Sequence, residues 1–266
     1  MILPQRKLGA TDLVVSALGL GTVKLGRNTD VKYPHDFVIP DDKQAADLLA
    51  MAKDLNINLL DTAPAYGNSE LLLGKLLQQQ RHDWVIVGKA GEEYQNNQST
   101  YDFSPAHIMN SIHNSLRNLR TDYLDVLLIH SNGDDEHIIN QFDVFNTLEK
   151  AKQQGLIRYS GMSTKTVKGG LLTLQNSDIA MVTYNPTATE ELPVIQAAQQ
   201  LNKGILIKKA LASGHLNKIS TNQPVQTAFD FIFQQAGVSS VILGTINARH
   251  LTDNVTCACE ALCVGA

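Results

Sequence analysis

The sequence predicts an α/β protein: a (β/α)8 TIM barrel with a short N-terminal β-hairpin cap. Eight short apolar segments alternate with eight amphipathic segments without a break, and such alternation is typical of parallel βαβ units. The length of 266 residues is close to the roughly 250 residues of a typical barrel of this kind. Because no low-complexity tract or Pro/Ser-rich linker divides the chain, we expect a single domain over residues 1–266.

The predicted strands are short runs with few polar residues, as strands buried on both faces require. They lie at residues 17–21, 57–60, 85–88, 124–129, 156–161, 179–183, 204–207 and 239–243. The predicted helices have apolar residues at helical spacing and lie at about 42–55, 69–80, 105–119, 138–154, 166–175, 190–202, 223–236 and 247–262. Ser104 followed by Pro105 is typical of a helix start, and Gly155 of a helix end.

Three further segments surround this pattern. Residues 6–8 and 13–15 flank Gly9-Ala10-Thr11-Asp12, which predicts a β-hairpin that covers the N-terminal end of the barrel. Long inserts at 24–41 and 90–103 follow the first and third strands. Both lie at the carboxyl ends of strands, where barrel enzymes carry their substrate loops.

Composition excludes several classes of function. The net charge is −4, and the Lys and Arg residues are scattered, so we expect no nucleic-acid partner. No segment approaches the ~18 apolar residues of a membrane span, and the first residues lack the layout of a signal peptide. We therefore expect a cytoplasmic protein without a membrane partner, as a monomer or small homo-oligomer. Cys257, Cys259 and Cys263 lack CxxC spacing, and we expect neither a metal site nor a disulfide from them.

Three neighbouring strands of the predicted barrel end on ionisable residues, namely Asp61, Lys89 and His130, and Tyr66 follows Asp61 through a short turn. Each of these side chains alone fits a structural role, such as capping a helix or facing solvent. Together they lie on the barrel face that carries active sites. We therefore predict a catalytic site at these strand ends.

This set of side chains suits proton transfer. Asp61 would keep Lys89 charged, and the ammonium would lower the pKa of the Tyr66 phenol. Tyr66 could then exchange a proton near neutral pH, while His130 would orient a substrate carbonyl. The four residues include no nucleophile, metal or electron source, so a reductant must come from a cofactor.

Longer segments around these positions are recognisable. They are LLDTAPAYG at 59–67 with Ser69 and Glu70, VGK at 87–89, SLR at 115–117, DYLD at 122–125, LIH at 128–130, GLIR at 155–158, GMS at 161–163, GT at 244–245, HL at 250–251 and Asn254. In this order, over about residues 8–263, the chain resembles the aldo-keto reductase family. The resemblance implies a barrel that binds NADP or NAD without a Rossmann fold. It also implies a tetrad of Asp61, Tyr66, Lys89 and His130, with Tyr66 as the general acid for carbonyl reduction.

The resemblance further implies the cofactor contacts, which are Gly21, Thr22, Ser163, Thr164, Lys208, Leu211, Gly244, Thr245, Asn247, His250 and Asn254. Three positions depart from the family pattern at the nicotinamide: Thr164 replaces an Asn, Met181 replaces a Gln, and Lys208 begins the segment that usually carries a stacking Tyr. Where NADP-selective members place cations, this chain has Gly244, Thr245, Asn247 and His250, with Arg249 nearby. The expected cofactor is therefore NADP or NAD.

We expect a small carbonyl or sugar-like substrate. Its pocket would be shaped by Val23, Lys24 and Tyr33 from the first insert and by Glu92, Glu93 and Tyr94 from the second. Two other functions stay open. One is a nicotinamide-dinucleotide-binding regulatory module with little turnover, and the other is a Schiff-base lyase that uses Lys208 or Lys209 as its amine.

Overall fold

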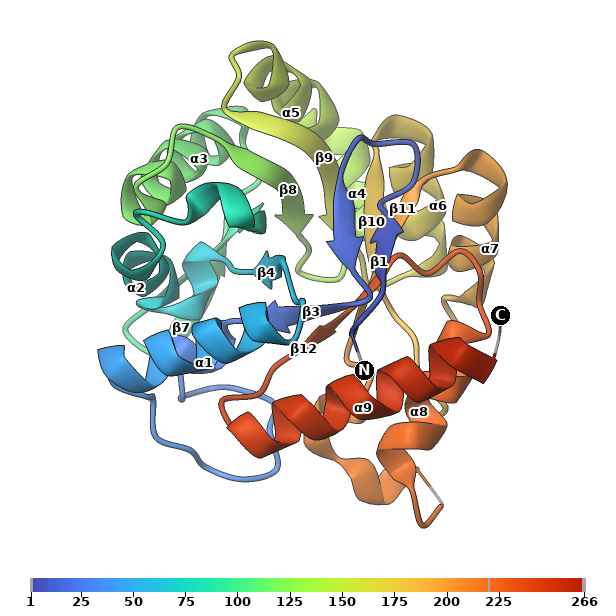
Figure 1. Cartoon of the computed structure of the whole chain (residues 1–266). Helices are drawn as coiled ribbons and strands as arrows, with labels where there is room; N and C mark the ends of the chain where they lie inside the picture. The colour runs from blue at the N-terminus through green and yellow to red at the C-terminus, as the bar shows by residue number, and fades with distance from the viewer. Residues whose placement is uncertain (1, 220, 265–266) are drawn as a thin grey trace.

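The structure is a computed structural model that describes residues 2–219 and 221–264. Eight parallel strands close into a barrel, with helices around the outside (Figure 1). Around the ring the strands are β3 (Leu18–Gly21), β4 (Leu59–Asp61), β5 (Val85–Ala90), β8 (Leu124–His130), β9 (Ile157–Ser163), β10 (Ile179–Thr183), β11 (Gly204–Lys208) and β12 (Ser240–Leu243). The predicted (β/α)8 barrel is confirmed.

The outer helices follow the strands in chain order. They are α1 (Asp42–Asp54), α2 (Ser69–Leu76), α3 (Pro105–Leu119), α4 (Asp135–Gln141), α5 (Val144–Gln153), α6 (Val167–Asn176), α7 (Leu192–Leu201), α8 (Pro224–Phe233) and α9 (Ala248–Val264). Within the described ranges, no helix is both long and apolar enough to cross a membrane.

The N-terminal hairpin covers the barrel end opposite the strand carboxyl ends. Its strands β1 (Gln5–Lys7) and β2 (Val14–Ser16) pair antiparallel. Leu8, Leu13 and Val15 are buried in one cluster with apolar residues of the barrel interior, including Leu59, Val87, Val126, Leu128 and Leu206. The predicted hairpin cap is present, and it fills the end of the barrel with apolar side chains.

The structure differs from the predicted pattern at one helix. A single helix was expected at 138–154, but α4 ends at Gln141 and α5 begins at Val144. Asp143 between them has a φ of 52°, which no continuous right-handed helix allows. Phe142 lies beside Phe103 with ring centroids 5.8 Å apart, so packing between α4 and the second insert accompanies the break.

The second insert also forms a structure that the sequence analysis did not predict. Strands β6 (Glu92–Gln95) and β7 (Gln98–Tyr101) pair antiparallel across Asn96 and Asn97, whose φ angles are 52° and 59°. Two consecutive residues with positive φ make the tight turn that suits a two-residue hairpin. The hairpin directly follows β5, the strand that carries Lys89.

The two inserts are joined to each other. The hydroxyls of Thr29 and Tyr94 lie 2.8 Å apart, and the guanidinium carbon of Arg27 lies 3.4 Å from the centroid of the Tyr94 ring. Arg27 also donates a hydrogen bond to the carbonyl oxygen of Ala65 at 3.0 Å. The first insert is thereby tied both to the β6–β7 hairpin and to the turn that carries Tyr66.

Candidate active site

Asp61 and Lys89 form a buried ion pair at the ends of neighbouring strands. Asp61 is the last residue of β4, and its side chain is 5% exposed, against 1% for Lys89. Nζ of Lys89 donates to Oδ1 of Asp61 and to the carbonyl oxygen of Thr62, the latter at 3.1 Å. Because an unpaired charge at this depth would be costly, each group supplies the partner that the other needs.

Tyr66 reaches the same carboxylate from the opposite side. A short 3-10 helix, Pro64–Tyr66, turns the chain back after β4. The Tyr66 hydroxyl donates to Oδ2 of Asp61 at 3.2 Å, and Nζ of Lys89 lies 4.7 Å from the centroid of the phenol ring. One carboxylate therefore binds an ammonium and a phenol on its two oxygens.

The prediction that Lys89 lowers the pKa of Tyr66 is wrong for the protein alone. Burial, followed by the negative charge of Asp61, raises the pKa of the phenol well above its ordinary value of 10. Tyr66 is therefore protonated at neutral pH, and this is the form that a general acid needs.

His130 completes the cluster. It ends β8, and its ring meets the ring of Tyr66 edge-on, with centroids 6.2 Å apart and an interplanar angle of 85°. Nδ1 of His130 lies 2.9 Å from Oε2 of Glu92, the first residue of β6. Burial lowers the pKa of His130, while the contact with Glu92 opposes that shift. The structure thus brings Asp61, Tyr66, Lys89 and His130 together and adds Glu92 to them.

Glu92 was expected only as a pocket residue, and its contact with His130 depends on the hairpin. Burial would raise its pKa, but hydrogen bonding to His130 and Ser99 outweighs burial and lowers the pKa of Glu92 to about 2. The two consecutive asparagines at 96–97 were the sequence signal for the turn. They indicated the hairpin but not the partner of Glu92.

Ser163, Thr164 and Lys208 meet across neighbouring strands. Ser163 ends β9 and lies beside Met181 in β10. Nζ of Lys208, at the end of β11, donates to Oγ of Ser163 at 2.9 Å and to the carbonyl oxygen of Thr164 at 2.6 Å. Burial lowers the pKa of Lys208 to about 7, while the nearby carboxylate of Glu191 opposes the shift. A lysine therefore occupies the space beside the two hydroxyl residues predicted to bind nicotinamide.

A second group of predicted cofactor residues surrounds the start of α9. Oγ1 of Thr245 accepts from the backbone N–H of Asn247 at 3.1 Å, and Oδ1 of Asn247 accepts from the N–H of His250 at 3.1 Å. Asn254 is buried within the same helix. Gly244 lies against Tyr33 so closely that a Cβ added to it would be 2.4 Å from the phenol oxygen.

The remaining predicted cofactor residues differ in what they contact. Gly21 lies beside Asp61 in the sheet register. The hydroxyl of Thr22 donates to the carbonyl oxygen of Asp61 at 2.9 Å and accepts from Oγ of Ser69 at 2.7 Å. Thr22 thus helps to fix the end of β4, which carries Asp61. Leu211 is half-buried after β11.

Only some of the residues predicted to shape the substrate pocket lie near the four-residue cluster. Oε1 of Glu93 accepts from Ser111 in α3 at 3.1 Å, and Tyr94 joins the two inserts, so neither contacts the four-residue cluster. Nζ of Lys24 lies 3.9 Å from the centroid of the Tyr33 ring, and Val23 is half-buried. Tyr33 is close enough to the cluster for Asp61 to contribute, after burial, to raising its pKa to about 12.

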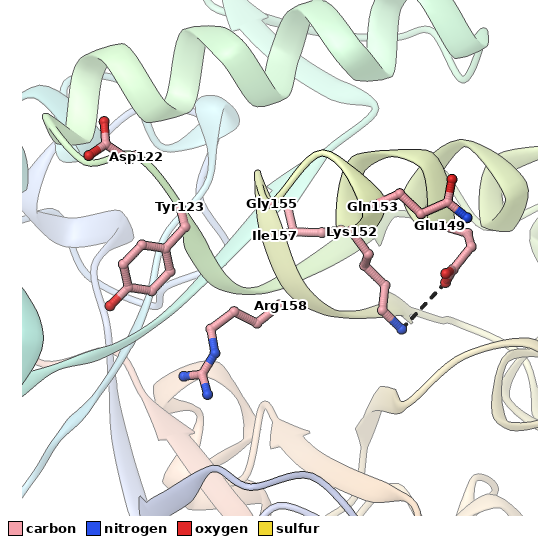
Figure 2. Close-up of a pocket in the computed structure, with 8 residues that line it drawn as sticks. All are labelled: Asp122, Tyr123, Glu149, Lys152, Gln153, Gly155, Ile157 and Arg158. Atoms are coloured by element: carbon pink, nitrogen blue, oxygen red, sulfur yellow. Dashed lines mark ion pairs between the residues drawn. The ribbon is translucent and has the colours of Figure 1, made fainter.

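A hollow of about 580 Å³ lies elsewhere on the barrel, beside the starts of β8 and β9 and the end of α5 (Figure 2). Lys152 and Glu149, which line it, are 3.5 Å apart. Because these strands begin here, the hollow is at the barrel end opposite Asp61, Lys89 and His130. Arg158, which also lines it, pairs with Asp12 and Asp125 instead. Because Asp61, Tyr66, Lys89 and His130 meet at the strand carboxyl ends, we assign the candidate site to that end of the barrel.

Comparisons with known proteins identify the family and agree with the barrel fold. The model of the Aldo/keto reductase family matches residues 17–226. The chain therefore belongs to the aldo/keto reductase family, a family of oxidoreductases.

The three cysteines of the chain, Cys257, Cys259 and Cys263, are free thiols.

Individual relatives span most or part of the chain. A crystal structure of a Pseudomonas aeruginosa protein assigned to the aldo-keto reductases is 50% identical, covers 97% of this chain and 95% of its own, and superposes with a TM-score of 0.89. The oxidoreductase YqkF of Bacillus subtilis is 26% identical over 96% of this chain and 90% of its own length. L-galactose dehydrogenase of Arabidopsis thaliana is 36% identical, over 59% of this chain and 47% of its own.

Proposed function

We propose that the protein is an NAD(P)-dependent oxidoreductase that reduces aldehyde or ketone carbonyls, or oxidises the corresponding alcohol or aldose, with Tyr66 as general acid and base. The observation that carries this proposal is the shared carboxylate of Asp61, which binds the ammonium of Lys89 on one oxygen and the phenol of Tyr66 on the other. His130 closes the cluster at the edge of the phenol ring. This arrangement suits proton delivery to a single oxygen atom.

In carbonyl reduction, Tyr66 would give its hydroxyl proton to the substrate oxygen as negative charge develops there. Because its pKa is raised, the phenol holds that proton at neutral pH until the substrate oxygen becomes basic. The ammonium of Lys89 would offset the negative charge left on the phenol. His130 would hydrogen-bond the same oxygen and fix its position. The nicotinamide cofactor supplies the hydride when it is bound.

The residues at the strand ends fit such a cofactor in chemical type. Ser163 and Thr164 offer hydroxyls, Lys208 offers a cation, and the start of α9 offers backbone N–H groups of the kind that bind phosphate. Gly244 lets the Tyr33 hydroxyl approach the backbone where a side chain would collide with it. Gly21, Thr22, Leu211, Thr245, Asn247, His250 and Asn254 would complete the contacts.

Both NAD and NADP are proposed as cofactors. Gly244, Thr245, Asn247 and His250 bring no Lys or Arg to the adenosine end. Arg249 is exposed and pairs loosely with Asp253 at 3.8 Å, which leaves it able to turn toward a 2′-phosphate. A small aldehyde or sugar-like substrate is supported by the relationship to L-galactose dehydrogenase.

The test is to titrate NADH and NADPH separately by fluorescence and then measure turnover with a panel of small aldehydes. Tyr66→Phe should lower kcat by about 100-fold or more, the contribution typical of a general acid, and should leave the Kd of the cofactor nearly unchanged. Tyr123→Phe, at the opposite end of the barrel, is the matched control. Tight cofactor binding without turnover in the wild type would favour a regulatory module instead.

One observation favours a second candidate function. The lowered pKa of Lys208, about 7, makes its amine partly neutral and therefore able to attack a carbonyl with loss of water, forming an imine. Borohydride added with an aldehyde would trap that imine as a mass increase on Lys208. No increase would remove this candidate and leave the oxidoreductase proposal untouched.

A further inference from the structure

We propose that Glu92 is a positioning residue of the active site, and that its carboxylate holds the proton of neutral His130 on Nδ1 so that Nε2 serves the substrate oxygen. The inference rests on the proposed function for the role of His130. Its structural basis, the pairing of Glu92 with His130, does not depend on turnover.

The carboxylate of Glu92 is held firmly. Glu92 is 9% exposed at the start of β6. Its Oε2 lies 2.9 Å from Nδ1 of His130, and its Oε1 accepts from Oγ of Ser99 in β7 at 2.7 Å. Oε1 is therefore hydrogen-bonded within the hairpin, and Oε2 lies against the end of β8.

The ionisation of Glu92 decides which nitrogen of His130 carries the proton. The pKa of Glu92 is lowered to about 2, because its bonds to His130 and Ser99 outweigh the effect of burial. At neutral pH the carboxylate can only accept hydrogen bonds. Nδ1 of His130 is buried, has no hydrogen-bond partner among the described residues and lies 2.9 Å from this carboxylate. A nitrogen lone pair would be repelled by the ionised oxygen at that distance, so the neutral ring should carry its proton on Nδ1 and none on Nε2.

The charges facing His130 come from several elements. Lys89 of β5 and Lys208 of β11 both disfavour a proton on the imidazole, as burial does, whereas Glu92 of β6 favours it. Tyr66 meets the ring edge and stays protonated. Glu92 thus supplies the negative charge in contact with the ring, against two cations and burial.

The consequence concerns hydrogen bonding to a carbonyl. With Nδ1 holding the proton of the neutral ring, Nε2 can donate to a carbonyl oxygen only after the ring takes up a second proton. Glu92 makes that imidazolium accessible. In the alcohol-oxidising direction the same neutral ring offers Nε2 as an acceptor to the hydroxyl. Removing the charge of Glu92 should therefore change the dependence on pH in addition to the rate.

The test uses the full chain with 15N-labelled histidine. The ring-nitrogen shifts of His130, assigned by their loss in His130→Asn, report both the tautomer and the pKa without any turnover. We expect the Nδ1–H tautomer in the wild type. In Glu92→Gln we expect the His130 pKa to fall by at least about one unit, since an opposite charge in contact shifts a pKa by about 1 to 3 units.

Glu93→Gln is the matched control, because the neighbouring carboxylate faces Ser111 in α3. It should leave the His130 shifts as in the wild type. In the kinetic arm, the ionisation that governs kcat/KM for aldehyde reduction should move to lower pH in Glu92→Gln and not in Glu93→Gln.

The neutral Nε2–H tautomer in the wild type would overturn the proposal, even if Glu92→Gln failed to fold. Unchanged His130 titration in a folded Glu92→Gln would do the same. The two proposals can fail separately. If the His130 titration shifts in Glu92→Gln but Tyr66→Phe keeps full activity, the proposed function is refuted and the pairing of Glu92 with His130 stands.

Discussion

The ammonium of Lys208 hydrogen-bonds Oγ of Ser163 at 2.9 Å, across the mouth of the barrel from β11 to β9. If nicotinamide binds beside Ser163, as proposed, a positive charge there disfavours the oxidised ring, which is itself a cation. We predict that Lys208→Met tightens binding of the oxidised cofactor relative to the reduced one. Fluorescence and calorimetric titration of both forms measures this ratio of Kd values.

The lowered pKa of Lys208 predicts the direction in which binding of the oxidised cofactor changes with pH. The pKa of Lys208 is lowered to about 7, so its charge is lost as the pH rises from 6 to 8. Binding of the oxidised cofactor to the wild type should strengthen over that range, and binding to Lys208→Met should not. Lys209→Met, which changes an exposed neighbour whose charge helps to lower the pKa of Lys208, should keep the pH response and move it to higher pH. An identical pH response in all three proteins would contradict the prediction.

The buried ion pair of Asp61 and Lys89 allows a test that separates activity from stability. Lys89→Met leaves the carboxylate buried without its cation, which should lower the free energy of unfolding by about 3 to 5 kcal/mol and abolish most turnover. The double variant Asp61→Asn/Lys89→Met should recover much of the stability in urea titrations. It should stay inactive, because no ammonium then faces Tyr66. Recovery of activity in the double variant would argue against the role of Lys89.

Gly26 holds the turn that carries Tyr66. A Cβ at Gly26 would lie 2.3 Å from the carbonyl oxygen of Tyr66 and 2.2 Å from the backbone nitrogen of Ser69. Gly26→Ala should displace the phenol and lower kcat by at least about 10-fold, because small misplacements at reacting groups are costly. Steady-state kinetics measures this effect.

Gly155→Ala is the control for Gly26→Ala. Gly155 has a φ of +74° and no heavy atom within 4 Å of an added Cβ. Alanine there should cost about 1 to 2 kcal/mol of stability through backbone strain without lowering kcat. Similar losses of kcat in both variants would indicate a general loss of folded protein.

The raised pKa of Glu70 predicts how the free energy of unfolding changes with pH. Burial raises its pKa from 4.5 to about 7, and Asn118 donates to its Oε2 at 3.3 Å. An acid with a raised pKa in the folded state favours folding below about pH 4.5, and this contribution is lost as the pH rises through 7. Relative to Glu70→Gln, the wild type should lose about 3 kcal/mol of unfolding free energy over that range. Urea titrations at pH 4.5 and 7.5 test this, and a constant difference between the two proteins would exclude it.

Most of the fold could be predicted because burial on both faces gives each barrel strand an apolar run. The predicted strand at 179–183 coincides with β10 (Ile179–Thr183). The break at Asp143 could not be predicted, because the apolar spacing of α4 and α5 reads as one helix. The break coincides with the positive φ of Asp143 and with the packing of Phe142 against Phe103, a contact between segments far apart in the sequence.

The candidate site could be predicted where residues end strands and not where partners come from loops. Asp61, Lys89 and His130 occupy strand ends, so the order of strands places them together. Glu92 reaches His130 only because a hairpin forms across the second insert. The pKa of Tyr66 depends on how deeply the phenol is buried and on the negative charge of Asp61 beside it. Neither can be predicted from the order of the residues in the sequence.

Arg27 and Thr29 of the first insert hold Tyr94 of the second. The two inserts are therefore not structurally independent of each other. Exchanging one insert with that of a relative would leave the other without its anchor, and would disturb Glu92 and the Tyr66 turn as well. Grafts that aim to change the substrate range of this barrel should transfer both inserts as one unit.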